Sequence, residues 1–244
     1  TLTDGFVGRT KELGLIEDAI RHNAGRVLWV SGRRGVGKSS LMAEAARRLI
    51  ESRDSTIVIP YFFRRGETGC SIYDFLVTAI ERLDPQATYS TAPDEQLQAF
   101  RDLLVQVSGR GDQAVIFVVD GVDEICALDP SFARIPLSCN MDNVTWICSG
   151  VTGQQPEPML LSAGVANLFT HGLSGLDEKS VYAMLIDGLP GEIRNELIGQ
   201  RVMDGDAPSN PIVTQLVKRS DGLALYVTMV IGELREGRRS LQSV

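Results

Sequence analysis

The chain has 244 residues, of which 43% are hydrophobic and 23% are charged, with a formal net charge of −7. This composition indicates a soluble globular protein that is long enough to bury a sizeable core, and no apolar run reaches the roughly 18 residues of a membrane helix. The acidic balance argues against a nucleic-acid partner, because proteins that bind nucleic acid usually present a basic face to the phosphates.

Helical and strand-like patterns alternate along the first two thirds of the chain, which is typical of an α/β protein. Apolar residues recur at helical spacing over residues 13–20, 41–49, 72–83 and 97–107. Strand-like apolar runs lie at residues 26–31, 56–63, 114–119, 144–148 and 166–170. Pro60 cannot donate a ladder hydrogen bond, so the second run is expected at a sheet edge or a strand end.

After Gly172 the pattern becomes wholly helical. Asp177 can cap one helix, Pro190 and Gly191 begin another, and residues 223–234 carry a clean apolar stripe. We therefore predict a five-stranded parallel α/β core sandwiched by helices over residues 1–172. A small helical, lid-like subdomain is expected over residues 173–244.

A glycine-rich loop follows the first strand run and precedes a helix. Its sequence, Gly32-Arg33-Arg34-Gly35-Val36-Gly37-Lys38-Ser39, matches the pattern G-x-x-x-x-G-K-[ST] of a P-loop. Glycines let the main chain approach closely, and successive N–H groups at a helix N-terminus surround phosphate with donors. The pattern predicts a P-loop NTPase core that binds ATP or ADP with Mg²⁺.

Individual roles follow from the residue types. Lys38 is expected to contact the β- and γ-phosphates, and the Ser39 hydroxyl is expected to hold Mg²⁺. Arg33 and Arg34 either contact phosphate or a neighbouring protomer, or face solvent as loop charges often do. The nucleotide contacts expected from this segment are Arg34, Gly35, Val36, Gly37, Lys38, Ser39 and Ser40.

An acidic turn, Asp120-Gly121-Val122-Asp123-Glu124, ends the third strand run. We expect this strand to lie next to the P-loop strand, because parallel α/β sheets present ligands at the carboxyl ends of their strands. Asp120 is then the second protein ligand of Mg²⁺. Glu124 is the candidate catalytic base, with Asp123 as its rival, acting beside Lys38.

The remaining features exclude other sites. The four cysteines have no C-x-x-C spacing, so neither a metal site nor a disulfide framework is expected, and buried reduced thiols favour the cytoplasm. No signal peptide opens the chain. The first residue is Thr1, which we interpret as the start of a piece of a longer protein.

Four short motifs, in order, resemble the STAND class of signal-transducing ATPases, within it the NACHT-like and apoptotic-ATPase-like bacterial members. They are Phe6-Val7-Gly8-Arg9 with Glu12, the acidic segment 115–124, the hinge Leu173-Ser174-Gly175-Leu176, and the element 220–226. The resemblance implies that Phe6, Val7 and Arg9 border adenine and that Leu225 closes over it. Two positions depart from the family: Ala224 replaces a proline, and Gly150 replaces an arginine expected to sense the γ-phosphate.

The resemblance also implies a mechanism. An ADP-bound closed form is inactive, and exchange for ATP drives self-association, with sensor and effector domains outside this segment. Gly150 puts efficient hydrolysis in doubt unless Arg9, Arg64, Arg65 or a partner supplies the charge. The leading hypothesis is therefore a slow switch ATPase in bacterial defence or signalling. The alternatives are a non-hydrolysing regulatory or scaffold module and, less favoured, an AAA-type ATPase acting on DNA.

Overall fold

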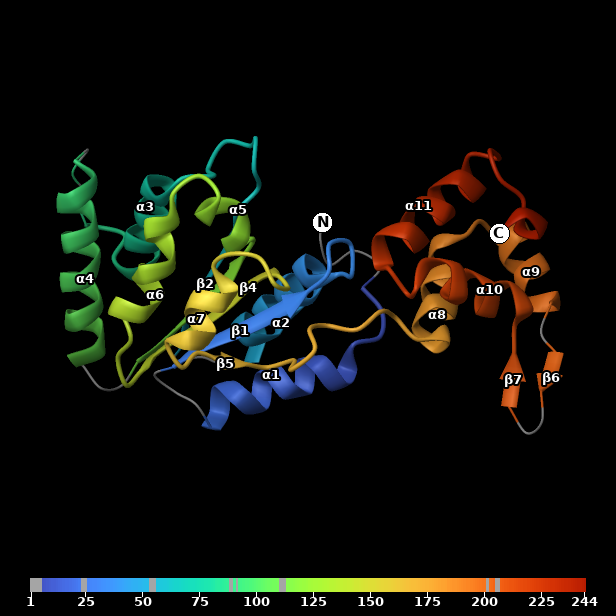
Figure 1. Cartoon of the computed structure of the whole chain (residues 1–244), viewed down its shortest axis with the longest axis horizontal. Coiled ribbons are helices and arrows are strands. Elements are labelled where there is room, and N and C mark those ends of the chain that lie inside the picture. Colours follow the sequence, from blue (N-terminus) through green and yellow to red (C-terminus); the bar gives the residue numbers. More distant parts are fainter. Residues whose placement is uncertain are drawn as a thin grey trace.

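A computed structural model of the chain describes residues 6–22, 26–52, 56–87, 90, 92–109, 113–200, 202–204 and 207–244. Its longest axis runs from an α/β core to a helical C-terminal part, which lies at the right of Figure 1. The hinge between them follows the short strand β5 (Ala166–Asn167). The glycine-rich loop at residues 32–39 lies at the end of the core that faces the C-terminal helices, where the Gly35 carbonyl accepts a hydrogen bond from the Leu225 N–H.

Helices and strands alternate in the core, as the periodicity predicts. The core elements are α1 (Thr10–His22), β1 (Val27–Gly32), α2 (Lys38–Ser52), β2 (Thr56–Phe62), α3 (Ile72–Leu83), α4 (Pro93–Gly109), β3 (Ala114–Asp120), α5 (Val122–Cys126), the 3-10 helix η1 (Pro130–Ala133), α6 (Arg134–Ser138), β4 (Val144–Val151), α7 (Glu157–Ser162) and β5 (Ala166–Asn167). The short helices α5, α6 and α7 are too brief to leave a periodic signal in the sequence.

The core sheet has five parallel strands in the order β2-β3-β4-β1-β5. The edge position of β2, predicted from Pro60, is confirmed. The expectation that the acidic strand β3 lies next to the P-loop strand β1 is wrong, because β4 lies between them. Both faces of β4 are buried, as expected of a central strand. Because β3 is also buried on both faces, periodicity alone cannot predict which of the two strands lies next to β1.

Alternating side chains of the strands fill two separate cores. Leu28 and Val30 of β1 pack with α1 and α2 on one face of the sheet. Val27 and Trp29 point to the opposite face, where α3 to α7 cover an aromatic cluster. Within that cluster the rings of Phe117 and Trp146 stack with centroids 3.9 Å apart. The predicted sandwich of helices around a parallel sheet is confirmed.

The C-terminal part packs around its own apolar cluster, which begins at Leu176 and ends at Val244. Its elements are α8 (Glu178–Gly188), α9 (Gly191–Gly199), β6 (Val202–Asp204), β7 (Ala207–Ser209), α10 (Pro211–Ser220), α11 (Ala224–Arg235) and η2 (Leu241–Ser243). Asp177 caps α8, its side chain accepting from the Ser180 N–H, as predicted. The expectation of a wholly helical region is wrong, because β6 and β7 pair as an antiparallel hairpin too short for a period-2 signal.

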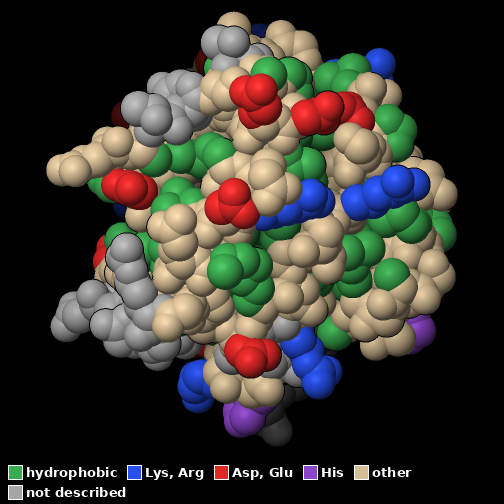
Figure 2. Space-filling view, turned by 90° about the vertical axis from the view of Figure 1, so that its left-hand side faces the viewer, with side chains coloured by type: hydrophobic (Ala, Val, Ile, Leu, Met, Phe, Trp, Pro, Cys, Tyr) green, Lys and Arg blue, Asp and Glu red, His purple; other side chains and the backbone are tan. Residues whose placement is uncertain are grey.

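The four cysteines are free thiols, and Cys126, Cys139 and Cys148 are buried. None of the helices in the described part of the chain has the length and apolar character that crossing a membrane requires. The end of the core that carries α4 faces the viewer in Figure 2, where acidic and basic side chains are interspersed. That face therefore presents no single field of positive charge.

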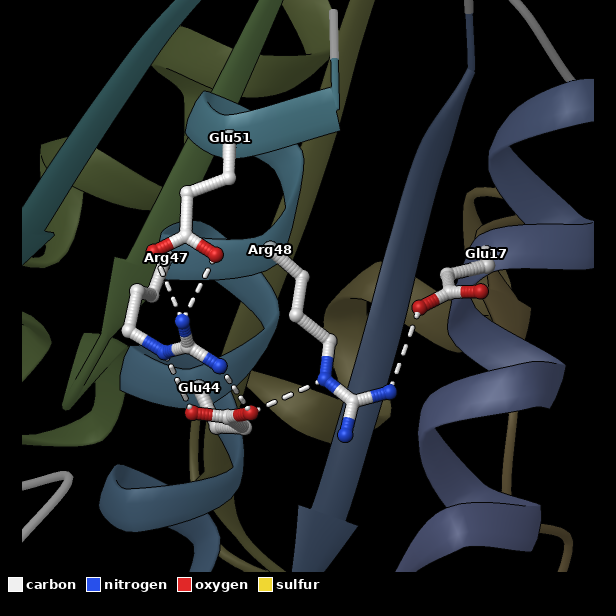
Figure 3. Close-up of polar contacts among 5 residues, drawn as sticks. All are labelled: Glu17, Glu44, Arg47, Arg48 and Glu51. Atoms are coloured by element: carbon white, nitrogen blue, oxygen red, sulfur yellow. Dashed lines mark hydrogen bonds and ion pairs between the residues drawn. The ribbon is translucent and has the colours of Figure 1, made fainter.

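An ion-pair network ties α2 to α1 (Figure 3). Glu44 is only 5% exposed and accepts hydrogen bonds from Arg47 and Arg48 at 2.8–2.9 Å. Arg48 also pairs with Glu17 of α1 at 3.8 Å, and Arg47 with Glu51. The pKa of Glu44 is lowered to about 2. The hydrogen bonds from Arg47 are the largest cause, and the hydrogen bond from Arg48 adds to it.

We expect Glu44→Gln to lower the free energy of unfolding at pH 7 by about 1–2 kcal/mol, since both arginines are partly solvent-screened. The folded pKa lies below the ordinary value of 4.5, so this contribution is complete above pH 4.5 and disappears as the pH falls toward 2. Urea unfolding of both proteins between pH 2.5 and 7 measures the difference. Glu51→Gln, on the exposed side of the same helix, is the control and should cost less than about 0.5 kcal/mol. An equal loss for both variants at every pH would contradict the assignment.

Candidate functional site

The glycine-rich loop connects β1 to α2 and has the backbone shape that phosphate binding requires. Gly35 and Gly37 have φ angles of 77° and 100°, a region that side chains disfavour. Lys38 begins α2, and its Nζ donates to the carbonyl oxygens of Gly32 at 2.8 Å and Arg33 at 3.0 Å. The ammonium is thus held over the loop by the loop's own carbonyls.

A cavity of about 500 Å³ opens beside this loop. It brings together residues from the loop, the ends of β2, β3 and β4, and the helix α5. They are Arg34, Gly35, Lys38, Ser39, Arg64, Arg65, Asp120, Gly121, Asp123, Glu124, Ala127, Val151 and Gln154. All three predicted catalytic residues and both predicted metal ligands therefore face one space.

Ser39 and Asp120 face the same point in this cavity. The Nη1 atom of Arg64 lies 3.5 Å from the Ser39 hydroxyl and 3.9 Å from Oδ2 of Asp120. Asp120 is 2% exposed, and its other oxygen accepts a hydrogen bond from the Ser149 hydroxyl of β4. A hydroxyl and a carboxylate are ligands that Mg²⁺ prefers, and phosphate oxygens and water complete such a shell. The donor set therefore fits this metal.

The ends of β2 and β3 are fastened together, which fixes Arg64 and Arg65 beside the acidic turn. The Phe63 N–H donates to the Asp120 carbonyl at 2.9 Å. Gly121 has a φ of 74°, and a Cβ placed on it would lie 2.5 Å from the Phe63 carbonyl oxygen. Only glycine allows this approach, so the turn after Asp120 packs tightly against the residue that follows β2.

The two candidate bases differ in environment. Burial raises the pKa of Asp123, while the Oε2 atom of Glu124 accepts from the Arg65 backbone N–H at 2.6 Å. Burial lowers the pKa of Lys38, and the carboxylate of Asp120 opposes that shift. Lys38 and Asp120 therefore line one cavity, although the strands β1 and β3 that lead to them are not neighbours.

The end of β4 is closed by an indole ring. A Cβ on Gly150 would lie 2.6 Å from the ring of Trp29, a buried residue of β1. The Trp29 Nε1–H donates to Oε1 of the buried Glu157 at 3.0 Å, which fixes the ring. No side chain fits at residue 150 while the ring is there, so the arginine expected from the family resemblance has no room.

A second, smaller cavity of about 110 Å³ lies on the other side of the loop. Six of its residues are predicted nucleotide contacts: Phe6, Val7, Arg9, Val36, Gly37 and Ser40. The others come from the C-terminal helices and their hinge, namely Leu176, Met184, Ala224 and Thr228. This mostly apolar space has the chemistry for a base, and the loop between the two cavities has the chemistry for phosphates.

Arg9 joins the loop to the hinge. It is 7% exposed, with a φ of 59°, and its guanidinium donates to the carbonyls of Val36 at 3.0 Å and Ser174 at 2.7 Å. Glu12 accepts a third hydrogen bond at 2.9 Å. Arg9 therefore ties the glycine-rich loop to the hinge, in addition to lining the smaller cavity.

Helix α11 begins directly on the loop. The Leu225 N–H donates to the Gly35 carbonyl at 3.0 Å, and Ala224 and Leu225 lie against the glycines of the loop. The Leu225 side chain is 59% exposed and does not line the apolar cavity. Its contact is with the phosphate-binding loop instead, which differs from the expected position over the base.

The model of the AAA ATPase domain matches residues 5–139, which is more than half of the chain. The chain belongs to the AAA ATPase domain family. It is therefore an ATPase domain that binds ATP or ADP with Mg²⁺, and the glycine cradle, Lys38 and the Ser39–Asp120 pair suit that ligand set. No curated protein matches this AAA ATPase domain in sequence.

Solved structures share the fold of this AAA ATPase domain. The ORC1 protein of Aeropyrum pernix in complex with DNA has 18% identity and a TM-score of 0.58 over 98% of this chain. The chain spans 63% of that ORC1 chain. The ORC2 protein of the same organism has 11% identity and a TM-score of 0.53. The match covers 96% of this chain and 71% of the ORC2 chain. Drosophila ORC bound to DNA has 14% identity and a TM-score of 0.51, and the match covers 94% of this chain and 57% of the Drosophila chain.

Proposed function

We propose that this AAA ATPase domain is the nucleotide-operated switch of a signalling protein of the STAND class. In this proposal the ADP form is closed, and exchange of ADP for ATP releases the helical lid and drives self-association. The observation that carries it is the hydrogen bond from the Leu225 N–H of the lid to the Gly35 carbonyl of the phosphate-binding loop. Because the loop that would hold the phosphates also holds the lid, a change at the phosphates acts directly on the lid.

The hinge supports the same proposal. We take the α/β domain as residues 1–172 and the helical lid as residues 173–244. Leu173 donates to the Ser31 carbonyl of β1 at 2.6 Å, so the hinge begins on the strand that carries the loop. Gly175 packs against the backbone of Asp221, and a Cβ there would lie 2.1 Å from that carbonyl oxygen. Since Arg9 also binds the hinge, the loop, hinge and lid are connected through three separate contacts.

We assign the roles in the site on chemical grounds. Lys38 binds the β- and γ-phosphates, Ser39 and Asp120 hold Mg²⁺, and Glu124 positions the attacking water. Asp123 is the alternative base. Base contacts come from the second cavity, and phosphate contacts from the loop between Arg34 and Ser40.

We expect slow hydrolysis because two positions beside the phosphate-binding loop, Gly150 and Leu225, carry no cationic side chain. Gly150 carries no side chain at the end of β4, and Leu225 brings an alkyl group to the loop. Cations that meet the developing charge of a transferred phosphoryl group supply much of the rate in such enzymes. If turnover is absent altogether, the non-hydrolysing scaffold becomes the better description.

A nucleic-acid partner is the less favoured proposal. Two of the structures that share the fold contain DNA, at 18% and 14% identity, and that likeness concerns the fold alone. The net charge of −7 and the mixed charges around α4 give DNA phosphates no continuous basic surface there.

Hydrogen exchange tests the switch. With ADP and Mg²⁺ we expect the Leu225 amide and the first turn of α11 to be protected. With a non-hydrolysable ATP analogue they should exchange at least about tenfold faster, because a ligand shifts a conformational equilibrium only through its differential affinity.

The central amides of β3, remote from the lid, are the control and should exchange equally in both states. Identical exchange of α11 with ADP and with the analogue, at saturating nucleotide, would contradict the switch proposal. It would leave nucleotide binding itself intact.

A further inference from the structure

We propose that Arg64 is the residue through which this domain distinguishes ATP from ADP. Its guanidinium lies beside Ser39 and Asp120, the residues proposed to hold Mg²⁺, and pairs with the terminal phosphate once Mg²⁺ binds there. This inference rests on the proposed nucleotide site at the P-loop. It does not depend on the lid movement.

The position of Arg64 is set by the backbone on either side of it. Phe63 continues the ladder between β2 and β3 by donating to the Asp120 carbonyl, and Gly121 closes tightly on Phe63. Arg64 is the next residue, so its side chain starts at the carboxyl end of the sheet. There its Nη1 atom reaches both Ser39 and Asp120, at 3.5 Å and 3.9 Å.

A guanidinium and a divalent cation cannot share this point. Ser39 and Asp120 are the residues proposed to hold Mg²⁺, and two cations at such a distance repel each other strongly inside a protein. Metal binding therefore displaces Arg64 from Asp120. The side chain is one-third exposed, so it can swing within the cavity without leaving the core packed behind it.

Among the described residues, few anionic groups near the displaced guanidinium are available to pair with it. Glu124 already accepts a hydrogen bond from the Arg65 N–H, and Asp120 is occupied by the metal and by Ser149. The terminal phosphate of ATP offers several oxygens, which suit the forked donors of an arginine. ADP lacks that group, so ATP offers Arg64 a partner that ADP does not.

Other cations in the site are less able to make this distinction. The cationic side chains that line the cavity in the described residues are those of Arg34, Lys38, Arg64 and Arg65. Lys38 lies over the loop, where it can reach the β-phosphate that both nucleotides carry, so its charge serves ADP as well as ATP. Trp29 excludes any side chain at residue 150, and the lid presents Leu225 to the loop. Arg64 is the one that stands between the two metal ligands.

Binding measurements on the whole domain test this inference. Isothermal titration would give the affinities for ADP and for a non-hydrolysable ATP analogue, each with Mg²⁺, in the native protein and in Arg64→Ala. We expect the variant to lose about 10- to 100-fold in affinity for the analogue, the range of a charge-assisted hydrogen bond. Affinity for ADP with Mg²⁺ should stay within about threefold or rise, because the competitor for Asp120 is gone.

Arg82→Ala is the control, since it removes the same charge from the exposed surface of α3, outside both cavities. It should leave the ratio of the two affinities unchanged within about threefold. Equal losses for both nucleotides in Arg64→Ala, or the same change of ratio in Arg82→Ala, would overturn the role of Arg64. Either result would leave the switch proposal unaffected, because that proposal is tested by hydrogen exchange of α11. A negative exchange result would in turn leave the affinity ratio a valid test of Arg64.

Discussion

Replacing Lys38 by alanine is expected to lower the affinity for ATP and for ADP together by at least about 100-fold, or about 3 kcal/mol. The ammonium lies over the loop carbonyls of Gly32 and Arg33, next to the backbone donors that phosphates would meet. Removing it takes away a loop cation that would bind the β-phosphate of either nucleotide. Titration with a fluorescent ADP derivative measures the loss.

Lys218→Ala is the control for this prediction, because Lys218 is an exposed lysine of α10 outside both cavities. It should bind ADP as the native domain does. Circular dichroism and thermal unfolding would check that both variants are folded. Native-like affinity in folded Lys38→Ala would show that phosphates bind elsewhere.

Glu124→Gln is expected to retain ATP while releasing phosphate about 10²- to 10⁴-fold more slowly. The amide keeps the shape of the side chain and can still accept from the Arg65 N–H, but it cannot take a proton from water. Single-turnover phosphate release with Mg²⁺ measures the rate, and titration with ATP measures retention.

Asp123→Asn separates the two candidate bases. Burial raises the pKa of Asp123, and its Oδ1 atom lies toward Gly150 at the end of β4. We expect a smaller decrease in phosphate release than for Glu124→Gln. A larger decrease would transfer the role of base to Asp123, and no turnover in the native domain would favour the scaffold alternative.

The chemistry of the site could be predicted because it is encoded locally. Gly32 to Ser39 lie within eight residues, and the strand before and helix after them are themselves short-range patterns. Asp120 was identifiable for a similar reason, since it ends the most strand-like segment of the chain. The P-loop motif together with the acidic end of this strand predicted that Lys38, Ser39 and Asp120 converge, although not along which strands.

What could not be predicted depends on distant contacts. The place of β4 between β1 and β3 follows from competition among strands that are all apolar. The need for glycine at residue 150 follows from Trp29, which is far away in sequence and beside it in space. Arg64 was one of several arginines that could supply the missing charge, and the pairing of Phe62 with Asp120 is what places it beside Ser39 and Asp120.

The broad family of ATPases was within reach of the sequence, while the finer class remains a proposal. The Gly-rich loop and acidic strand end fit an AAA ATPase domain as well as a STAND switch. The features that favour the switch are the hydrogen bonds of Arg9 to the loop and the hinge, and the contact of Leu225 with Gly35. Neither has a sequence pattern specific enough to stand alone.

Mass spectrometry of the purified, undenatured domain tests the phosphate-binding loop most directly. We predict a bound species heavier than the chain by the mass of ADP or ATP, with or without Mg²⁺, that is absent from Lys38→Ala and present in Lys218→Ala. A native domain that carries no nucleotide and gains none after incubation with millimolar ADP and Mg²⁺ would contradict the account.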